Sequence, residues 1–161
     1  EVGEADGSDK SVATVRRLVK TIKEVDATRY VTMGADKFRF GDGTGGHEKV
    51  ANELDAVGFN YSEANYESLR AKHPTWLIYG SETSSATRTR GSYYHPEREW
   101  VGSNQEDRHY EQSDYGNDRV GWGRTATDSW TFDRDHAGYA GQFIWTGTDY
   151  IGEPTPWHNQ N

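Results

Sequence analysis

The sequence contains no cysteine. Disulfide bonds and cysteine-based metal sites are therefore excluded, while the cellular compartment is left open. Basic residues are also scarce, because 18 lysines and arginines stand against 26 aspartates and glutamates and give a net charge of -8. This surplus of negative charge disfavours phosphate-rich partners, so we expect neither nucleic acid nor an anionic membrane surface to bind. No apolar run is long enough to cross a bilayer, and no stretch has the pattern of a signal peptide.

Aliphatic side chains are few, since hydrophobic residues make up only 32% of the 161 residues and the mean hydropathy is -1.02. Aromatic residues nevertheless reach 13%, with 6 Trp and 10 Tyr, so disorder is a poor explanation. Such rings most commonly fill a core, but many aromatics beside few aliphatics also suggest a cleft in which sugars pack against ring faces. The length suits one domain with one core.

The chain is organised around residues 76–83, which read Trp-Leu-Ile-Tyr-Gly-Ser-Glu-Thr. The apolar run at 76–79, bounded by Pro74 and Gly80, predicts a strand buried on both faces, as in a parallel sheet. Glu82 would then stand just past the carboxyl end of this strand, where α/β folds place their chemistry. A glutamate at a strand end is also commonly structural or merely solvated, so position alone leaves both interpretations open.

Helices and strands are predicted to alternate along the rest of the chain. The first helix begins after Ser8 or Asp9, either of which can cap it. Further helices are expected at 47–54, 66–72 and 130–139, and further strands at 30–35, 56–61 and 141–147. This alternation implies parallel strands and suggests half of a (β/α)₈ barrel, with a long polar and aromatic insertion at about 83–129. A half barrel has two open edges, so we expect the sequence to be part of a longer chain.

Polar and aromatic residues at the strand ends are the candidates for chemistry. Asn60 and Tyr61 close the strand next to that of Glu82, and the tyrosine hydroxyl could orient the carboxylate. Trp145 closes the last strand, where it could form the floor of a sugar site or belong to the core. Retaining glycosidases use two carboxyl groups about 5–5.5 Å apart, one as nucleophile and one as general acid/base. Glu1 is the best candidate for the second carboxyl, because it would top the strand before the first helix.

Two other kinds of site find little support. The glycine-rich loop at 41–46 lacks the spacing of a phosphate-binding loop, which disfavours a nucleotide. The six histidines show no closely spaced ligand pattern, so we expect no structural metal.

Two stretches carry a resemblance to a known family. Residues 79–85 read Tyr-Gly-Ser-Glu-Thr-Ser-Ser, and residues 141–156 read Gly-Gln-Phe-Ile-Trp-Thr-Gly-Thr-Asp-Tyr-Ile-Gly-Glu-Pro-Thr-Pro. Together they resemble glycoside hydrolase family 2, and within it the β-galactosidases. The resemblance runs through nearly the whole chain and implies an α/β fold that is the C-terminal half of a (β/α)₈ barrel, from strand 4 or 5 to strand 8.

The resemblance also implies a mechanism that retains the anomeric configuration. It makes Glu82 the nucleophile, Glu1 the acid/base (with Glu4 as the alternative) and Tyr61 the residue that orients the nucleophile. The family's acid/base follows an Asn, which would precede the first residue of this chain. The resemblance implies that Trp145, Asp149 and Glu153 bind the substrate. Asn60, whose side-chain amide stands at a strand end, is a further candidate for substrate binding.

The expected partner is a β-galactoside or oligosaccharide substrate. The resemblance implies no required cofactor, although Mg²⁺ or Na⁺ is found in some full-length family members. The isolated chain is expected to be inactive because it needs the N-terminal half of the barrel, and a homo-oligomer is compatible with the resemblance. Another family 2 activity, β-glucuronidase or β-mannosidase, is the alternative, as is a non-catalytic carbohydrate-binding role. Glucuronidases resemble one another in an Asn-x-Lys tripeptide that binds the sugar carboxylate. No such tripeptide occurs in the sequence, which disfavours a β-glucuronidase activity.

Overall fold

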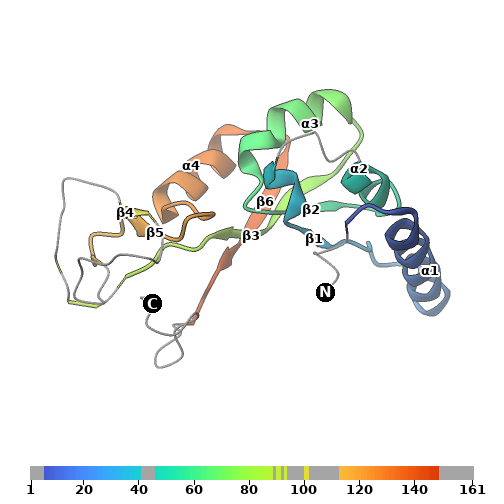
Figure 1. Ribbon diagram of the computed structural model, residues 1–161, viewed down its shortest axis with the longest axis horizontal. Coiled ribbons are helices and arrows are strands. Elements are labelled where there is room, and N and C mark those ends of the chain that lie inside the picture. Colours follow the sequence, from blue (N-terminus) through green and yellow to red (C-terminus); the bar gives the residue numbers. More distant parts are fainter. Residues whose placement is uncertain are drawn as a thin grey trace. The chain divides into compact units, whose positions relative to one another are not determined.

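The computed structural model describes residues 6–40, 46–88, 90–91, 93, 100–101 and 113–148. The chain divides into two compact units (Figure 1). The first unit contains Glu1–Glu82 and His136–Phe143, and the second contains Thr83–Asp135 and Ile144–Asn161. The second unit therefore begins where the polar insertion was expected to begin. A single barrel domain over the whole chain stays a prediction.

A four-stranded sheet in the order β1-β2-β3-β6 forms the centre of the first unit. β1 (Gly34–Ala35) pairs in parallel with β2 (Val57–Asn60), and β2 pairs in parallel with β3 (Ile78–Ser84). β6 (Tyr139–Trp145) is the neighbour on the other side of β3. The last residues of β3 and β6 belong to the second unit. The parallel pairing confirms the predicted α/β class.

Helical segments connect the parallel strands of the first unit. η1 (Lys37–Phe40) and α2 (Gly46–Ala51) lie between β1 and β2 in the chain, and η3 (Glu63–Asn65) and α3 (Tyr66–Lys72) lie between β2 and β3. Figure 1 shows α2 and α3 on the same side of these strands, with α1 (Asp9–Val25) next to α2. The predicted cap of α1 is confirmed, because the Ser8 side chain accepts a hydrogen bond from the Ser11 amide at 3.2 Å. No helix in the described part of the chain is both long and apolar enough to cross a bilayer.

The core of the first unit lies where these helical segments meet the sheet. Phe59 on β2 and Ile78 on β3 are fully buried, and Val50 of α2 is buried with them. The ring of Phe38 packs against Phe59 with 5.6 Å between centroids. Each such side chain stabilises the fold by about 1.5–3 kcal/mol relative to leaving it exposed. This packing fixes β2 and β3 against each other, and the candidate site is built on these two strands.

Several predicted boundaries were wrong for identifiable reasons. The strand predicted from Trp76 begins at Ile78, because the Trp76 indole instead donates to the Asn52 side chain at 3.0 Å and stacks on His73 with 3.8 Å between ring centroids. The strand predicted at 30–35 is reduced to Gly34–Ala35. The backbone amide of Val31 donates to the Asp55 carboxylate at 2.8 Å rather than to a neighbouring strand.

The described residues of the second unit include a two-stranded parallel sheet and the helix α4. β4 (Trp100–Val101) pairs with β5 (Asp118–Arg119). A helix was predicted at 130–139, whereas α4 (Ala126–Asp135) both begins and ends four residues earlier. β6 then starts at Tyr139. Thr125 explains the earlier start, because its hydroxyl accepts from the Asp128 amide at 3.1 Å and donates to the Asp128 carboxylate at 2.7 Å. This reciprocal contact caps a helix that begins directly after Thr125.

Candidate active site

Glu82 lies within β3, not beyond its end as predicted. The register between β2 and β3 shifts beside it, because Phe59 is opposite Gly80 whereas Asn60 is opposite Glu82. One extra β3 residue, Ser81, is therefore accommodated as a β-bulge. A bulge re-aims the side chains of the strand that carries it, and such bulges are common next to active sites. Here two successive β3 residues, Ser81 and Glu82, both contact the single β2 residue Asn60.

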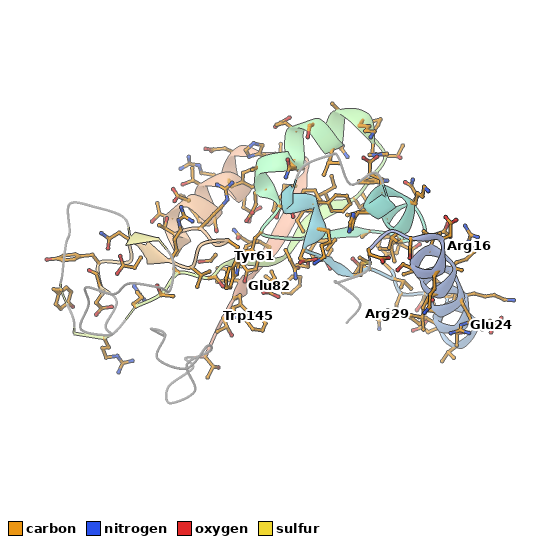
Figure 2. All side chains as sticks on the ribbon, in the orientation of Figure 1. Arg16, Glu24, Arg29, Tyr61, Glu82 and Trp145 are labelled. Carbon is orange, nitrogen blue, oxygen red and sulfur yellow. The ribbon has the colours of Figure 1, made fainter. Side chains whose placement is uncertain are left out.

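Each carboxylate oxygen of Glu82 accepts one hydrogen bond from β2 or the residue after it. The Tyr61 hydroxyl donates to Oε1 at 2.8 Å, and the Asn60 side-chain amide donates to Oε2 at 3.3 Å. Figure 2 shows Tyr61 and Glu82 side by side. Asn60 and Tyr61 are buried, whereas Glu82 is half-buried. Two donors therefore hold the carboxylate, and Glu82 as a residue is only partly buried.

Tyr61 is held by its backbone as well as by its hydroxyl. Its φ angle is 57°, in the left-handed region that residues other than glycine seldom adopt. In this conformation its amide donates to the backbone oxygen of Glu82 at 3.1 Å, while its side chain reaches the carboxylate of the same residue. Unfavourable backbone conformations of this kind cost about 1–3 kcal/mol and cluster at functional sites. The predicted proximity of Tyr61 and Glu82 is confirmed, and the orienting role in catalysis stays a prediction.

The contacts of Asn60 differ from what its position at a strand end suggested. Its side-chain oxygen accepts a hydrogen bond from the Ser81 hydroxyl at 2.7 Å, and its side-chain nitrogen donates to Glu82. Both ends of the amide are thus engaged inside the protein, and a substrate-binding role for Asn60 stays a prediction. Sequence reasoning gave Ser81 no role. A small polar residue directly before the candidate nucleophile was the available signal, but the bulge that brings it to Asn60 is not readable from the sequence.

Gly58 makes room for this arrangement. A Cβ atom at this position would lie 2.5 Å from the Ser81 hydroxyl oxygen and 2.6 Å from the backbone oxygen of Met33. Real Cβ atoms do not approach other atoms this closely, so a side chain here would displace Ser81 or the neighbouring strand. The glycine in β2 is therefore needed for close approach of its neighbours.

Trp145 belongs to the second unit and ends β6. Its backbone oxygen accepts from the Ser85 amide at 3.2 Å, and its side chain is 44% exposed. Ser84 and Ser85 both have positive φ angles, of 72° and 56°, directly after Thr83 in the chain. Contact of Trp145 with a sugar bound at Glu82 stays a prediction.

The remaining predicted site residues lie outside the described part of the chain. These are the acid/base candidate Glu1, its alternative Glu4, and the substrate-binding candidates Asp149 and Glu153. Where the structure describes the chain, it contains no group of three or more His, Asp or Glu side chains arranged to hold a metal ion. The Mg²⁺ or Na⁺ found in some full-length family members stays an expectation.

Comparison with known proteins identifies the class to which this fold and site belong. The chain is 34% identical over 160 residues, or 96% of its length, to the β-galactosidase BoGH2A of Bacteroides ovatus. It spans only 18% of the length of that relative. No family model matches the chain.

Two solved structures of family 2 members are similar to the chain in fold. A glycosyl hydrolase family 2 member from Bacteroides cellulosilyticus DSM 14838 matches 93% of the chain with a TM-score of 0.58 and 26% identity, and the match covers 15% of that protein. A crystal structure of a family 2 member from Bacteroides cellulosilyticus matches 88% of the chain with a TM-score of 0.57 and 24% identity, over 13% of its own length. The chain is therefore a homologue of glycoside hydrolase family 2 proteins, as the resemblance in the sequence indicated.

Proposed function

We propose that this chain supplies the nucleophile side of the active site of a retaining β-galactosidase. The observation that carries the proposal is the carboxylate of Glu82, which has a donor on each oxygen and belongs to a residue that is only half-buried. Similarity to a named β-galactosidase over 96% of the chain supports the substrate class. The parallel order of β1, β2 and β3 supports the further proposal that the chain is the C-terminal half of a (β/α)₈ barrel.

The proposed reaction is a double displacement. In the first step a Glu82 oxygen forms a bond to the anomeric carbon while the bond to the leaving oxygen breaks, and that oxygen takes a proton from Glu1. In the second step Glu1 accepts a proton from water, whose oxygen attacks the anomeric carbon. The bond to Glu82 then breaks and restores its carboxylate, and Glu1 is again protonated.

Tyr61 and Asn60 would serve the second step most directly. In the covalent intermediate Glu82 is a neutral ester, and negative charge returns to its carboxylate as the sugar leaves. Donors already aimed at these oxygens stabilise that developing charge without reorganising. Trp145, Asp149 and Glu153 would bind the sugar, and the mechanism needs no cofactor.

The proposal is tested by replacing the nucleophile in the full-length protein. We expect Glu82→Gln to abolish hydrolysis of a chromogenic β-galactoside and to leave substrate binding largely intact. Glu24→Gln is the matched control, because Glu24 is 63% exposed on α1 and away from Glu82 (Figure 2). Inactivation by a 2-fluoro galactoside should label Glu82, as mapped by peptide mass spectrometry. Unchanged turnover of Glu82→Gln would refute the nucleophile role.

A panel of substrates tests the specificity separately. Chromogenic β-galactoside, β-glucuronide and β-mannoside should be compared at equal enzyme concentration. We expect the galactoside to give the highest kcat/KM. A preference for either of the other two would keep the nucleophile assignment and overturn the substrate class. Binding of sugar without turnover of any of the three would instead favour a carbohydrate-binding role.

A further inference from the structure

Ser81 is the side chain next to the candidate nucleophile that the proposed reaction does not use. Its hydroxyl donates to the side-chain oxygen of Asn60 at 2.7 Å. The nitrogen of the same amide donates to Glu82 at 3.3 Å. Three side chains on two strands therefore form a chain of hydrogen bonds that ends on the carboxylate.

An asparagine amide has two nearly isosteric ends with opposite hydrogen-bonding character. If the amide of Asn60 turned over, its oxygen would face the Glu82 carboxylate and two acceptors would repel each other. The carboxylate only accepts hydrogen bonds, so the turned amide would lose its bond to Glu82. The Ser81 hydroxyl adds a second hydrogen bond to the observed orientation, because it donates to the oxygen end of the amide. Ser81 therefore helps to hold the Asn60 amide in the orientation that gives Glu82 a donor.

The surrounding backbone keeps Ser81 in place for this task. The bulge puts Ser81 and Glu82 beside the same β2 residue, and Gly58 leaves the space that the Ser81 side chain occupies. The backbone oxygen of Asn60 also accepts from the hydroxyl of Ser62, which is fully buried. The main chain at Asn60 is therefore anchored, and rotation of its side-chain amide is the freedom that Ser81 removes.

We propose that Ser81 is a positioning residue, which holds the Asn60 amide so that its N–H group meets the nucleophile Glu82. This inference rests on the proposed function, because it assigns Ser81 a part in the same reaction. Its effect falls on the step in which charge returns to Glu82, which is the release of the sugar.

The test is a double-mutant cycle in the full-length protein, with Ser81→Ala, Asn60→Ala and the double variant. The measured quantity is the rate constant for release of the sugar from the glycosyl-enzyme. We expect Ser81→Ala alone to lower this rate constant by about threefold to tenfold, the range for a modest hydrogen bond. In the Asn60→Ala background the same change should have no further effect, since the residue through which Ser81 acts is gone. Ser68→Ala is the matched control, because the Ser68 hydroxyl donates to a backbone oxygen on the exposed surface of α3.

A second pair of variants covers the case in which Ser81→Ala does not fold. Ser81→Thr and Ser81→Val have nearly the same shape and differ in the hydroxyl alone, and both suit a strand. We expect the threonine variant to release sugar faster than the valine variant while their KM values agree.

The outcomes separate the two proposals. An equal loss from Ser81→Ala in both backgrounds, or no loss in either, would overturn the positioning role, and so would equal rates for the threonine and valine variants. If Glu82→Gln is inactive in the same assay, the proposed function survives that result. If Glu82→Gln remains active, the proposed function fails and the role of Ser81 fails with it.

Discussion

Replacing Tyr61 with phenylalanine removes a single oxygen atom from the candidate site. That oxygen lies 2.8 Å from Oε1 of Glu82, while the ring stays buried and the backbone amide keeps its bond to Glu82. A hydrogen bond to a charged group contributes about 1.5–3 kcal/mol. Glu82 is half-buried, so water can replace part of this loss, and the lower end of the range applies.

The two chemical steps should respond differently to this loss. In the first step Glu82 loses charge as it attacks, so removal of a donor does little harm electrostatically. In the second step charge returns to Glu82, and the transition state carries about half of it. At the lower end of the range the loss is then about 0.8 kcal/mol, which corresponds to roughly a fourfold slower release of the sugar.

The assay is pre-steady-state hydrolysis of an aryl β-galactoside with a good leaving group by the full-length protein. We expect kcat of Tyr61→Phe to fall by about fourfold, kcat/KM to fall less, and a burst of released phenol to appear. A kcat that does not change would refute the argument. So would an equal fall in kcat and kcat/KM without a burst, because Tyr61 would then act before the covalent intermediate forms.

Two further predictions concern the scaffold. Gly58→Ala should lower the free energy of unfolding by about 1–3 kcal/mol and lower kcat, since its Cβ would lie 2.5 Å from the Ser81 hydroxyl. The control in the same denaturation and kinetic assays is Gly121→Ala, whose Cβ would meet no atom within 4 Å. Equal effects of the two substitutions would contradict the packing argument. Glu48 is buried, and burial acts to raise its pKa. Hydrogen bonds from the Lys72 and His73 side chains outweigh this effect, so the pKa of Glu48 is lowered. Its stabilising contribution is therefore present above about pH 4.3 and lost as the pH falls through the lower folded pKa. Wild type should exceed Glu48→Gln in unfolding free energy at pH 7 and approach it at pH 3, whereas a constant difference would be contrary to this reasoning.

Local signals in the sequence predicted the helices better than the strands. Ser8 caps α1 as its side-chain chemistry requires, and α3 spans Tyr66–Lys72 as expected. Both signals act within a few residues along the chain. The start of α4 was missed although its signal was equally local, because Thr125 and Asp128 have the spacing of a capping box that was not recognised.

The strand errors arise from contacts between distant residues. Trp76 looks like a strand residue in its apolar run, but it packs against His73 and Asn52, so β3 starts later. The contact with Asn52 joins residues 24 positions apart, and no period in the sequence shows it. The pairing of β3 with β2 likewise joins distant residues, and it extends as far as Glu82.

The sequence likewise predicted only part of the candidate site. Family resemblance pointed to Glu82 and Tyr61, and the structure brings these two together. It could not reveal Ser81, because the serine reaches Asn60 only through the one-residue shift between β2 and β3. A shift of one residue normally turns a side chain to the opposite face of a sheet, so no alternation pattern could place both Ser81 and Glu82 beside Asn60.

The contacts that hold Glu82 come from a short part of the chain. Tyr61, Asn60 and Ser81 all lie on β2, on β3 or directly after β2, and these strands are paired in parallel through the core of the first unit. The orientation of the nucleophile therefore depends on one strand pair and its bulge. The general acid/base requires a carboxyl from another strand, for which Glu1 is the candidate. In this proposal the nucleophile and the acid/base are therefore held by different strands. We expect substitutions in β2 to change the rate of sugar release more than the protonation of the leaving group.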